Sequence, residues 1–130
     1  MKYILKSMVL AMLIIFSFSA MAVAGGDAAN GEKLFKSKKY KCKVCHKLTA
    51  KNKVGPGLKG VTSRRSEGWL AKWLGDPKKT WEENDAETQE MRKWKKSRVK
   101  AKKTKMKMKK TPSGQEVADI IAFLKKNDGS

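Results

Sequence analysis

The sequence predicts an all-α protein with about three principal helices. Three segments begin at a side chain that can cap a helix, and apolar residues follow at helical spacing. The sequence contains no alternating apolar and polar run typical of a strand, and no internal repeat. A length of 130 residues fits one domain and excludes a sheet-rich multidomain enzyme. The net charge of +19 excludes an acidic protein of the calcium-buffer kind.

Residues 1–24 are predicted to be a signal peptide. Lys2 and Lys6 precede an uncharged stretch with a short apolar centre, and a small-x-small sequence ends at Ala24. The alternative is an uncleaved membrane anchor, which needs about 17–25 apolar residues. The short apolar part and the alanine-rich exit favour cleavage near Ala24. We therefore expect a single domain at 25–130 that works in the periplasm or is otherwise exported.

The first two helices are expected to begin at side-chain caps. Asp27 is placed to cap a helix at about 28–38, and Ser66 is placed to cap the second. Asp76-Pro77 is expected to end the second helix, because a residue before proline disfavours the helical conformation. The apolar face of the second helix consists of Trp69, Leu70, Trp73 and Leu74.

A charged insertion is expected between the second and third helices, at about 81–110. Its first part is acidic, and 12 of its last 19 residues are Lys or Arg, so the two parts are expected to attract each other. Trp81 and Trp94 flank the charged run and are expected to hold it against the body of the protein. Ser113 and Glu116 form a capping box that opens the third helix. The buried face of that helix is predicted to consist of Val117, Ile120, Ile121 and Leu124.

Cys42-Lys43-Val44-Cys45-His46 is the segment that carries chemistry. A thioredoxin-like dithiol needs a βαβ setting, and a structural zinc site needs four ligands, whereas the exported chain has two Cys and one His. A disulfide across two residues restrains little of the unfolded chain. C-x-x-C-H is the attachment signature of haem c, in which Cys42 and Cys45 form thioethers and His46 binds the iron.

The sequence also resembles the class I c-type cytochromes over nearly all of the exported chain. Gly31 and Phe35 match the family's N-terminal helix motif, and Phe123 stands where the family has its partner aromatic residue. Gly-Pro-Gly-Leu at 55–58 follows the haem motif at the family spacing. The resemblance implies a small cytochrome c fold, in which about three principal helices wrap around one covalently attached haem c with its iron.

The resemblance also implies the groups on either side of the iron. The carbonyl of Pro56 is expected to accept the Nδ1 proton of His46. Met106 precedes the last helix as the sixth-ligand methionine does in the mitochondrial relatives, and Met108 is the alternative if the loop is tighter. Met91 is interpreted as a filler on a helix face, and lysine ligation is the remotest option.

Four further side chains are candidates for the surroundings of the haem. Trp69 and Trp73 are expected to pack against the haem and the core, with donation of an indole N–H to a haem propionate as the alternative. Arg64 and Arg65 are candidates to neutralise a propionate. The equally favoured alternative is that both are solvated arginines of a loop.

These features predict a one-electron carrier rather than an enzyme, because both axial positions would be closed. The alternative is a haem protein or complex subunit whose labile distal site binds a small ligand. The lysine excess predicts docking of acidic redox partner proteins. An anionic membrane surface is a second possibility, a charged surface without a specific partner is a third, and nucleic acid is the least favoured. Lysines flank both sides of the proposed iron site, at positions 38, 39, 41, 43 and 47 and within 102–110.

Overall fold

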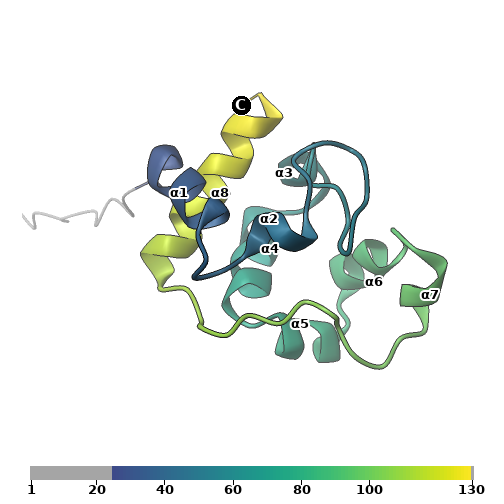
Figure 1. The fold of residues 1–130 in the computed structure, drawn as a ribbon. Helices are drawn as coiled ribbons and strands as arrows, with labels where there is room; N and C mark the ends of the chain where they lie inside the picture. Colours follow the sequence, from purple (N-terminus) through teal and green to yellow (C-terminus); the bar gives the residue numbers. More distant parts are fainter. Residues whose placement is uncertain (1–24, 130) are drawn as a thin grey trace, which may run out of the picture.

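The computed structural model describes residues 25–129, and the predicted signal peptide at 1–24 lies outside the described residues. Within the described range the chain is helical and has no strand, which confirms the predicted fold class (Figure 1). The helices are α1 (Ala28–Lys36), α2 (Cys42–Cys45), α3 (Val61–Arg64), α4 (Glu67–Gly75), α5 (Pro77–Glu83), α6 (Ala86–Arg92), α7 (Lys96–Val99) and α8 (Gly114–Asp128). Among residues 25–129, no helix is long and apolar enough to span a bilayer.

The three predicted helices are α1, α4 and α8, and each begins at its expected cap. The Asp27 carboxylate accepts the Ala29 N–H at 2.8 Å, and the Ser66 hydroxyl accepts the Trp69 N–H at 3.1 Å. Ser113 opens α8 with a complete capping box. The predicted end of α1 at residue 38 was wrong, because the N–H and hydroxyl of Ser37 both donate to the Leu34 carbonyl and end the helix at Lys36.

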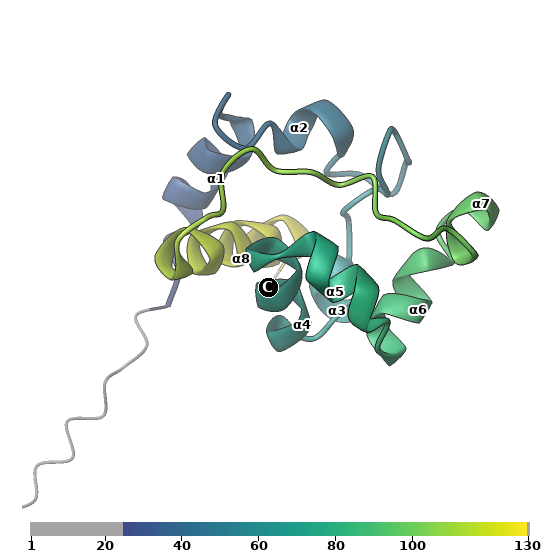
Figure 2. The ribbon, with the colours of Figure 1, turned by 90° about the horizontal axis from the view of Figure 1, so that it is seen from below.

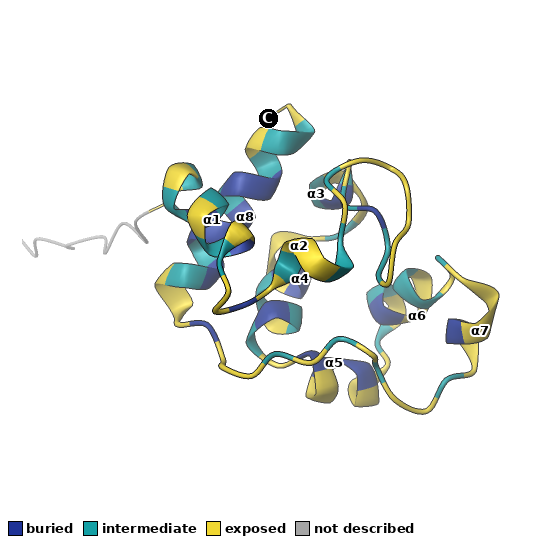
Figure 3. Cartoon of the chain, in the orientation of Figure 1, coloured by how far each residue is buried: buried dark blue, intermediate teal, exposed yellow. Residues whose placement is uncertain are grey.

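The two terminal helices of the described chain cross in close contact (Figure 2). At the crossing, a Cβ on Gly31 would overlap the Asp119 carbonyl and lie 2.8 Å from Cβ of Phe123. Beside it, the rings of Phe35 and Phe123 pack with centroids 5.5 Å apart. The buried part of α8 lies along the middle of the helix, where α1 passes over it (Figure 3). Close approach of the two backbones therefore depends on the missing side chain of Gly31.

A second set of contacts ties the start of α8 to the chain before α2. Glu116 accepts hydrogen bonds from the Tyr40 hydroxyl and the Lys39 ammonium, both at 2.6 Å. These donors and the Ser113 N–H hold the pKa of the Glu116 carboxyl well below its ordinary range, at about 2. The apolar core continues from Tyr40 through α4 to α8. Its buried members are Tyr40, Val61, Trp69, Leu70, Leu74, Val117, Ile120, Ile121 and Leu124.

The predicted charged insertion at about 81–110 is more ordered than the sequence indicates. Pro77 ends α4 as predicted, but it is also the first residue of α5, where its missing N–H is tolerated. The short helices α5, α6 and α7 are followed by an extended segment at 100–113, here called the strap, which returns to α8 (Figure 1). Trp81 is 2% exposed and donates its indole N–H to the Ala101 carbonyl. Its ring packs with that of Trp73 in α4, with centroids 6.3 Å apart, so it holds the insertion against the body as expected.

The acidic part of the insertion pairs mainly with the body rather than with the basic part. Glu83 and Asp85 both bind Lys72 of α4, at 2.8 and 2.6 Å. Among the described residues, Glu90 and Lys93 form the one ion pair that joins the acidic and basic parts. The other basic residues of 92–110 therefore have no carboxylate partner within residues 25–129.

The α1–α8 crossing predicts how glycine substitutions affect stability. Gly31→Ala should lower the free energy of unfolding by about 1–3 kcal/mol, because the added methyl group forces the two backbones apart. Gly68→Ala is the matched control, since a Cβ on Gly68 in α4 meets nothing within 4 Å. That change should be neutral or stabilise the protein by roughly 0.5–1 kcal/mol. Denaturant unfolding of both variants measures the difference, and equal stability would contradict the packing described.

Candidate haem-binding site

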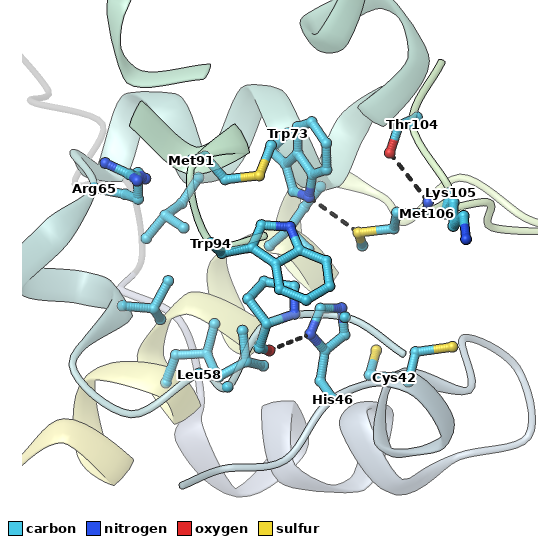
Figure 4. A pocket seen from close by; sticks show the side chains of 18 of the residues that line it. Cys42, His46, Leu58, Arg65, Trp73, Met91, Trp94, Thr104, Lys105 and Met106 are labelled. Atoms are coloured by element: carbon cyan, nitrogen blue, oxygen red, sulfur yellow. Dashed lines mark hydrogen bonds between the residues drawn. The ribbon is translucent and has the colours of Figure 1, made fainter. Parts of the chain in front are cut away.

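A largely apolar cavity of about 380 Å³ lies between α2, α4, α8 and the strap. Leu70 and Leu74 of α4 and Ile120 and Leu124 of α8 form part of its apolar wall. The predicted site residues Cys42, Cys45, His46, Pro56 and Met106 all line this one cavity. His46 and Met106 face it from opposite walls, below and above in the view of Figure 4. The structure thus brings together residues that lie as much as 64 positions apart in the sequence.

The two cysteines are placed by α2, which is a single helical turn. The turn closes through a hydrogen bond of 2.9 Å from the His46 N–H to the Cys42 carbonyl. Both thiols are free and partly buried, and both border the cavity. Burial raises the pKa of the Cys42 thiol to about 11, so it is protonated at neutral pH. Two cysteine sulfur atoms therefore border the space beside the imidazole.

His46 is held in one tautomer and one orientation. Its Nδ1 lies 2.9 Å from the Pro56 carbonyl oxygen, which can only accept, so Nδ1 carries the proton and Nε2 keeps its lone pair. Burial lowers the pKa of the imidazole, which favours the neutral form that binds metals. A Cβ on Gly55 would lie 2.5 Å from Cε1 of the ring, so glycine is what lets the loop approach the imidazole.

Met106 is positioned by contacts on both its backbone and its sulfur. Its N–H donates to the Thr104 hydroxyl at 3.0 Å, and its Sδ accepts the indole N–H of Trp73 at 3.0 Å (Figure 4). Met108 borders a second groove, which Met106 also lines, and does not line the haem cavity. Met91, interpreted from the sequence as a filler, does line the cavity, although its spacing carries no signal of this.

The indole N–H groups of Trp69 and Trp73 and the guanidinium groups of Arg64 and Arg65 all have hydrogen-bond partners within the chain. The Trp69 N–H donates to the Thr88 hydroxyl at 2.9 Å, and the Trp73 N–H is taken by Met106, so both indoles already have partners within the chain. Trp69 and Trp73 stack with ring centroids 5.2 Å apart. Arg64 and Arg65 line the cavity, and both donate to backbone carbonyls.

The donor set fits a haem attached through thioethers. The cavity offers two thiols and a neutral imidazole from one short segment, a thioether on the opposite wall, and apolar sides suited to a macrocycle. Among the described residues, no cluster of three His, Cys, Asp or Glu side chains is arranged to hold a bare metal ion. An iron centre here depends on the porphyrin nitrogens for its remaining ligands.

The closeness of Gly55 to the imidazole predicts the effect of one methyl group. Gly55→Ala should displace the His46 ring and weaken its bond to iron, giving less low-spin haem and a loss of about 1–3 kcal/mol in unfolding free energy. Gly75→Ala is the control, because a Cβ at that position meets nothing within 4 Å. Optical spectra and haem content of the two purified variants provide the measurement. A native spectrum in Gly55→Ala would show that the ring does not depend on this contact.

Comparison with known proteins gives the same answer as the geometry. The family model for cytochrome c matches residues 28–128. Cytochrome c-554 of Methylosinus trichosporium is 36% identical, and the match covers 94% of this chain and 92% of the relative. Cytochrome c2 of Blastochloris viridis is 35% identical over 91% of this chain and 93% of its own length. Cytochrome c2 of Rhodomicrobium vannielii is 35% identical over 99% of both chains.

A solved structure supports the fold. An engineered cytochrome c from Rhodothermus marinus, bound to a carbene intermediate, superposes with a TM-score of 0.57 at 19% identity. The match covers 79% of this chain and 78% of the other, which shows the fold alone. The predicted family, fold and cofactor are confirmed together, and the chain belongs to the cytochrome c family, with a covalently attached haem c as its cofactor.

Proposed function

We propose that this protein is an exported one-electron carrier rather than an enzyme, with Cys42 and Cys45 as the thioether positions and His46 and Met106 as the axial ligands. The observation that carries the proposal is the placement of one imidazole and one thioether on opposite walls of a single cavity. Each is fixed by a hydrogen bond, to Pro56 and from Trp73 respectively. When bound, the haem iron supplies the change between ferric and ferrous states.

The chain's own residues adjust the balance between the ferric and ferrous states and shield the iron from water. The Pro56 carbonyl makes the imidazole a stronger donor by drawing on its Nδ1 proton. The Trp73 N–H withdraws electron density from the Met106 sulfur, and this favours the ferrous state. The apolar walls keep water from the site.

The partner is proposed to be an acidic redox protein that docks on exposed lysines around the cavity. Lys43 lies on α2, and Lys105 and Lys107 flank Met106 on the strap and border the cavity. Within residues 25–129, none of these three forms an ion pair with a carboxylate, so their charge is available to steer a partner. Such steering would act in the periplasm or another exported compartment. The same lysines would also attract an anionic membrane surface.

One feature favours the alternative of a labile distal site. Met106 lies on the strap, which has no helix between residues 100 and 113, and most of the neighbouring lysines are exposed. A strap of this kind can move away more readily than a ligand carried on a helix. An open iron would then bind a small ligand such as carbon monoxide.

Optical spectroscopy of the haem-loaded protein separates the carrier from the ligand-binding alternative. We expect a low-spin ferric spectrum with a methionine–iron charge-transfer band, and little carbon monoxide binding to the ferrous form. Met106→Ala should remove the band and open the iron to carbon monoxide, and Met108→Ala should leave both unchanged. A high-spin native protein that binds carbon monoxide would favour the labile distal site, and loss of the band only in Met108→Ala would reassign the ligand.

Electron exchange with a carboxylate-coated electrode tests the docking surface. Lys43→Glu/Lys105→Glu should slow exchange about 10-fold at low salt, and the difference should shrink as salt screens the charges. Lys33→Glu/Lys126→Glu carries the same change in net charge on exposed positions of α1 and α8 and should have a smaller effect. Equal slowing by the two pairs would show that net charge, and not the lysines around the cavity, controls the rate. Vesicles containing anionic lipid provide the test of membrane binding.

A further inference from the structure

The insertion helices close the end of the cavity that lies away from the cysteines. The α6 helix is anchored where α4 begins, because the Ser66 N–H donates to the Glu87 carboxylate at 2.8 Å and the Trp69 indole donates to Thr88. Arg65, next to Ser66, lies at one end of the cavity in Figure 4, and Cys42 lies toward the other. The insertion therefore covers the end bordered by Arg65.

Arg98 of α7 is a buried cation at this cavity. It is 9% exposed, whereas Arg64 is exposed and Arg65 is half-buried, and all three line the cavity. Its guanidinium lies 5.0 Å from the centre of the Trp81 ring and donates to the Lys103 carbonyl. Arg92 lies 4.0 Å from the same ring, so one buried indole packs against two guanidinium groups.

Neither guanidinium has an ion-pair partner within the described chain, and Arg98 is the buried one, since Arg92 is only partly buried. Among residues 25–129, no carboxylate lies within ion-pair distance of either Arg92 or Arg98. The Nε of Arg92 is buried without a hydrogen-bond partner. Burial, together with the charge of Arg98, lowers the pKa of Arg92. A buried charge without an anion is unfavourable, and Arg98 lines the cavity, so its burial favours an anionic group there.

The chemistry of haem supplies such a group at this end. The two vinyl groups lie at one edge of the porphyrin and the two propionates at the opposite edge. Attachment of the vinyl groups at Cys42 and Cys45 therefore directs the propionates away from α2, toward the end that the insertion closes. Neither Trp69 nor Trp73 has a free indole N–H to donate there.

We propose that Arg98 is the cation that pairs with a haem propionate, held in place by Trp81 and by the Lys103 carbonyl, so that the charged insertion is part of the haem site. The inference rests on the proposed attachment at Cys42 and Cys45. The charge of Arg98 keeps the propionate ionised and disfavours the additional positive charge of ferric iron. The charged side chains that border the same cavity are Arg64, Arg65, Glu90, Arg98, Lys105 and Lys107.

The midpoint potential of the haem-loaded protein, measured from about pH 5 to pH 8, tests this pairing. Arg98→Gln should lower the potential and should raise the pKa of one propionate by about 1 unit or more. The potential should then fall with rising pH through that range, because the ionised carboxylate stabilises ferric iron. Lys96→Gln removes the same charge from an exposed position of α7 and should keep the native profile.

A native pH profile in Arg98→Gln would overturn the proposal and leave Arg98 as a packing partner of Trp81. If Arg98→Gln does not accumulate with haem, Arg98→Lys keeps the charge but loses the planar fork. The resonance Raman bending mode of the propionates should shift in that variant, and an unshifted mode would also overturn the proposal. Failure of the attachment itself is distinguishable, because the native protein would then lack covalent haem in a denaturing haemochrome assay.

Discussion

The close contact between Gly31 and α8 determines how the rest of the chain is arranged. It joins the two ends of the described chain, so everything from 37 to 113 must leave the crossing and return to it. That long excursion carries the cysteines, the histidine, both indoles of α4 and the methionine, and it closes around a cavity that borders the apolar core. The macrocycle of the haem adds apolar surface to that core. The crossing of α1 and α8 therefore holds together the two ends of a chain that folds around the cofactor cavity.

The two tryptophans of α4 connect the rest of the chain to the insertion and to the strap. Trp69 donates to Thr88 and fastens the insertion, and Trp73 donates to Met106 and fastens the strap. Since the two indole rings stack on each other, a movement of the insertion or of the strap would displace both rings. A hydrogen bond to the thioether sulfur also bears on the balance of ferric and ferrous iron, because a sulfur with less electron density favours the ferrous form. One helical turn thus fixes the geometry of this wall and, in the site proposed, contributes to the electronic character of Met106.

The sequence predicts best the features that depend on local rules. Asp27, Ser66 and Ser113 identify three helices, because a side-chain cap followed by helical periodicity is a local signal. C-x-x-C-H identifies the cofactor because the spacing itself carries the chemistry. The short helices of the insertion were not predicted in detail, since their stability comes from contacts with distant residues such as Lys72. The bond from Trp73 to Met106 and the burial of Arg98 were also out of reach, because a linear sequence of lysines and arginines does not show which one is enclosed.

Position, more than number, decides what the positive charges of this protein do. Most of its lysines are exposed to water and salt. Their charges attract a partner as it approaches, and salt screens this attraction beyond about 10 Å. Arg98 is enclosed, so its charge is little screened and acts on whatever shares the cavity. In the function proposed, the same basic segment does two separable things: the exposed residues influence the rate of approach, and the buried guanidinium bears on the energy of the electron once it arrives. A change in salt should alter the first more than the second, because a buried charge is screened less than an exposed one.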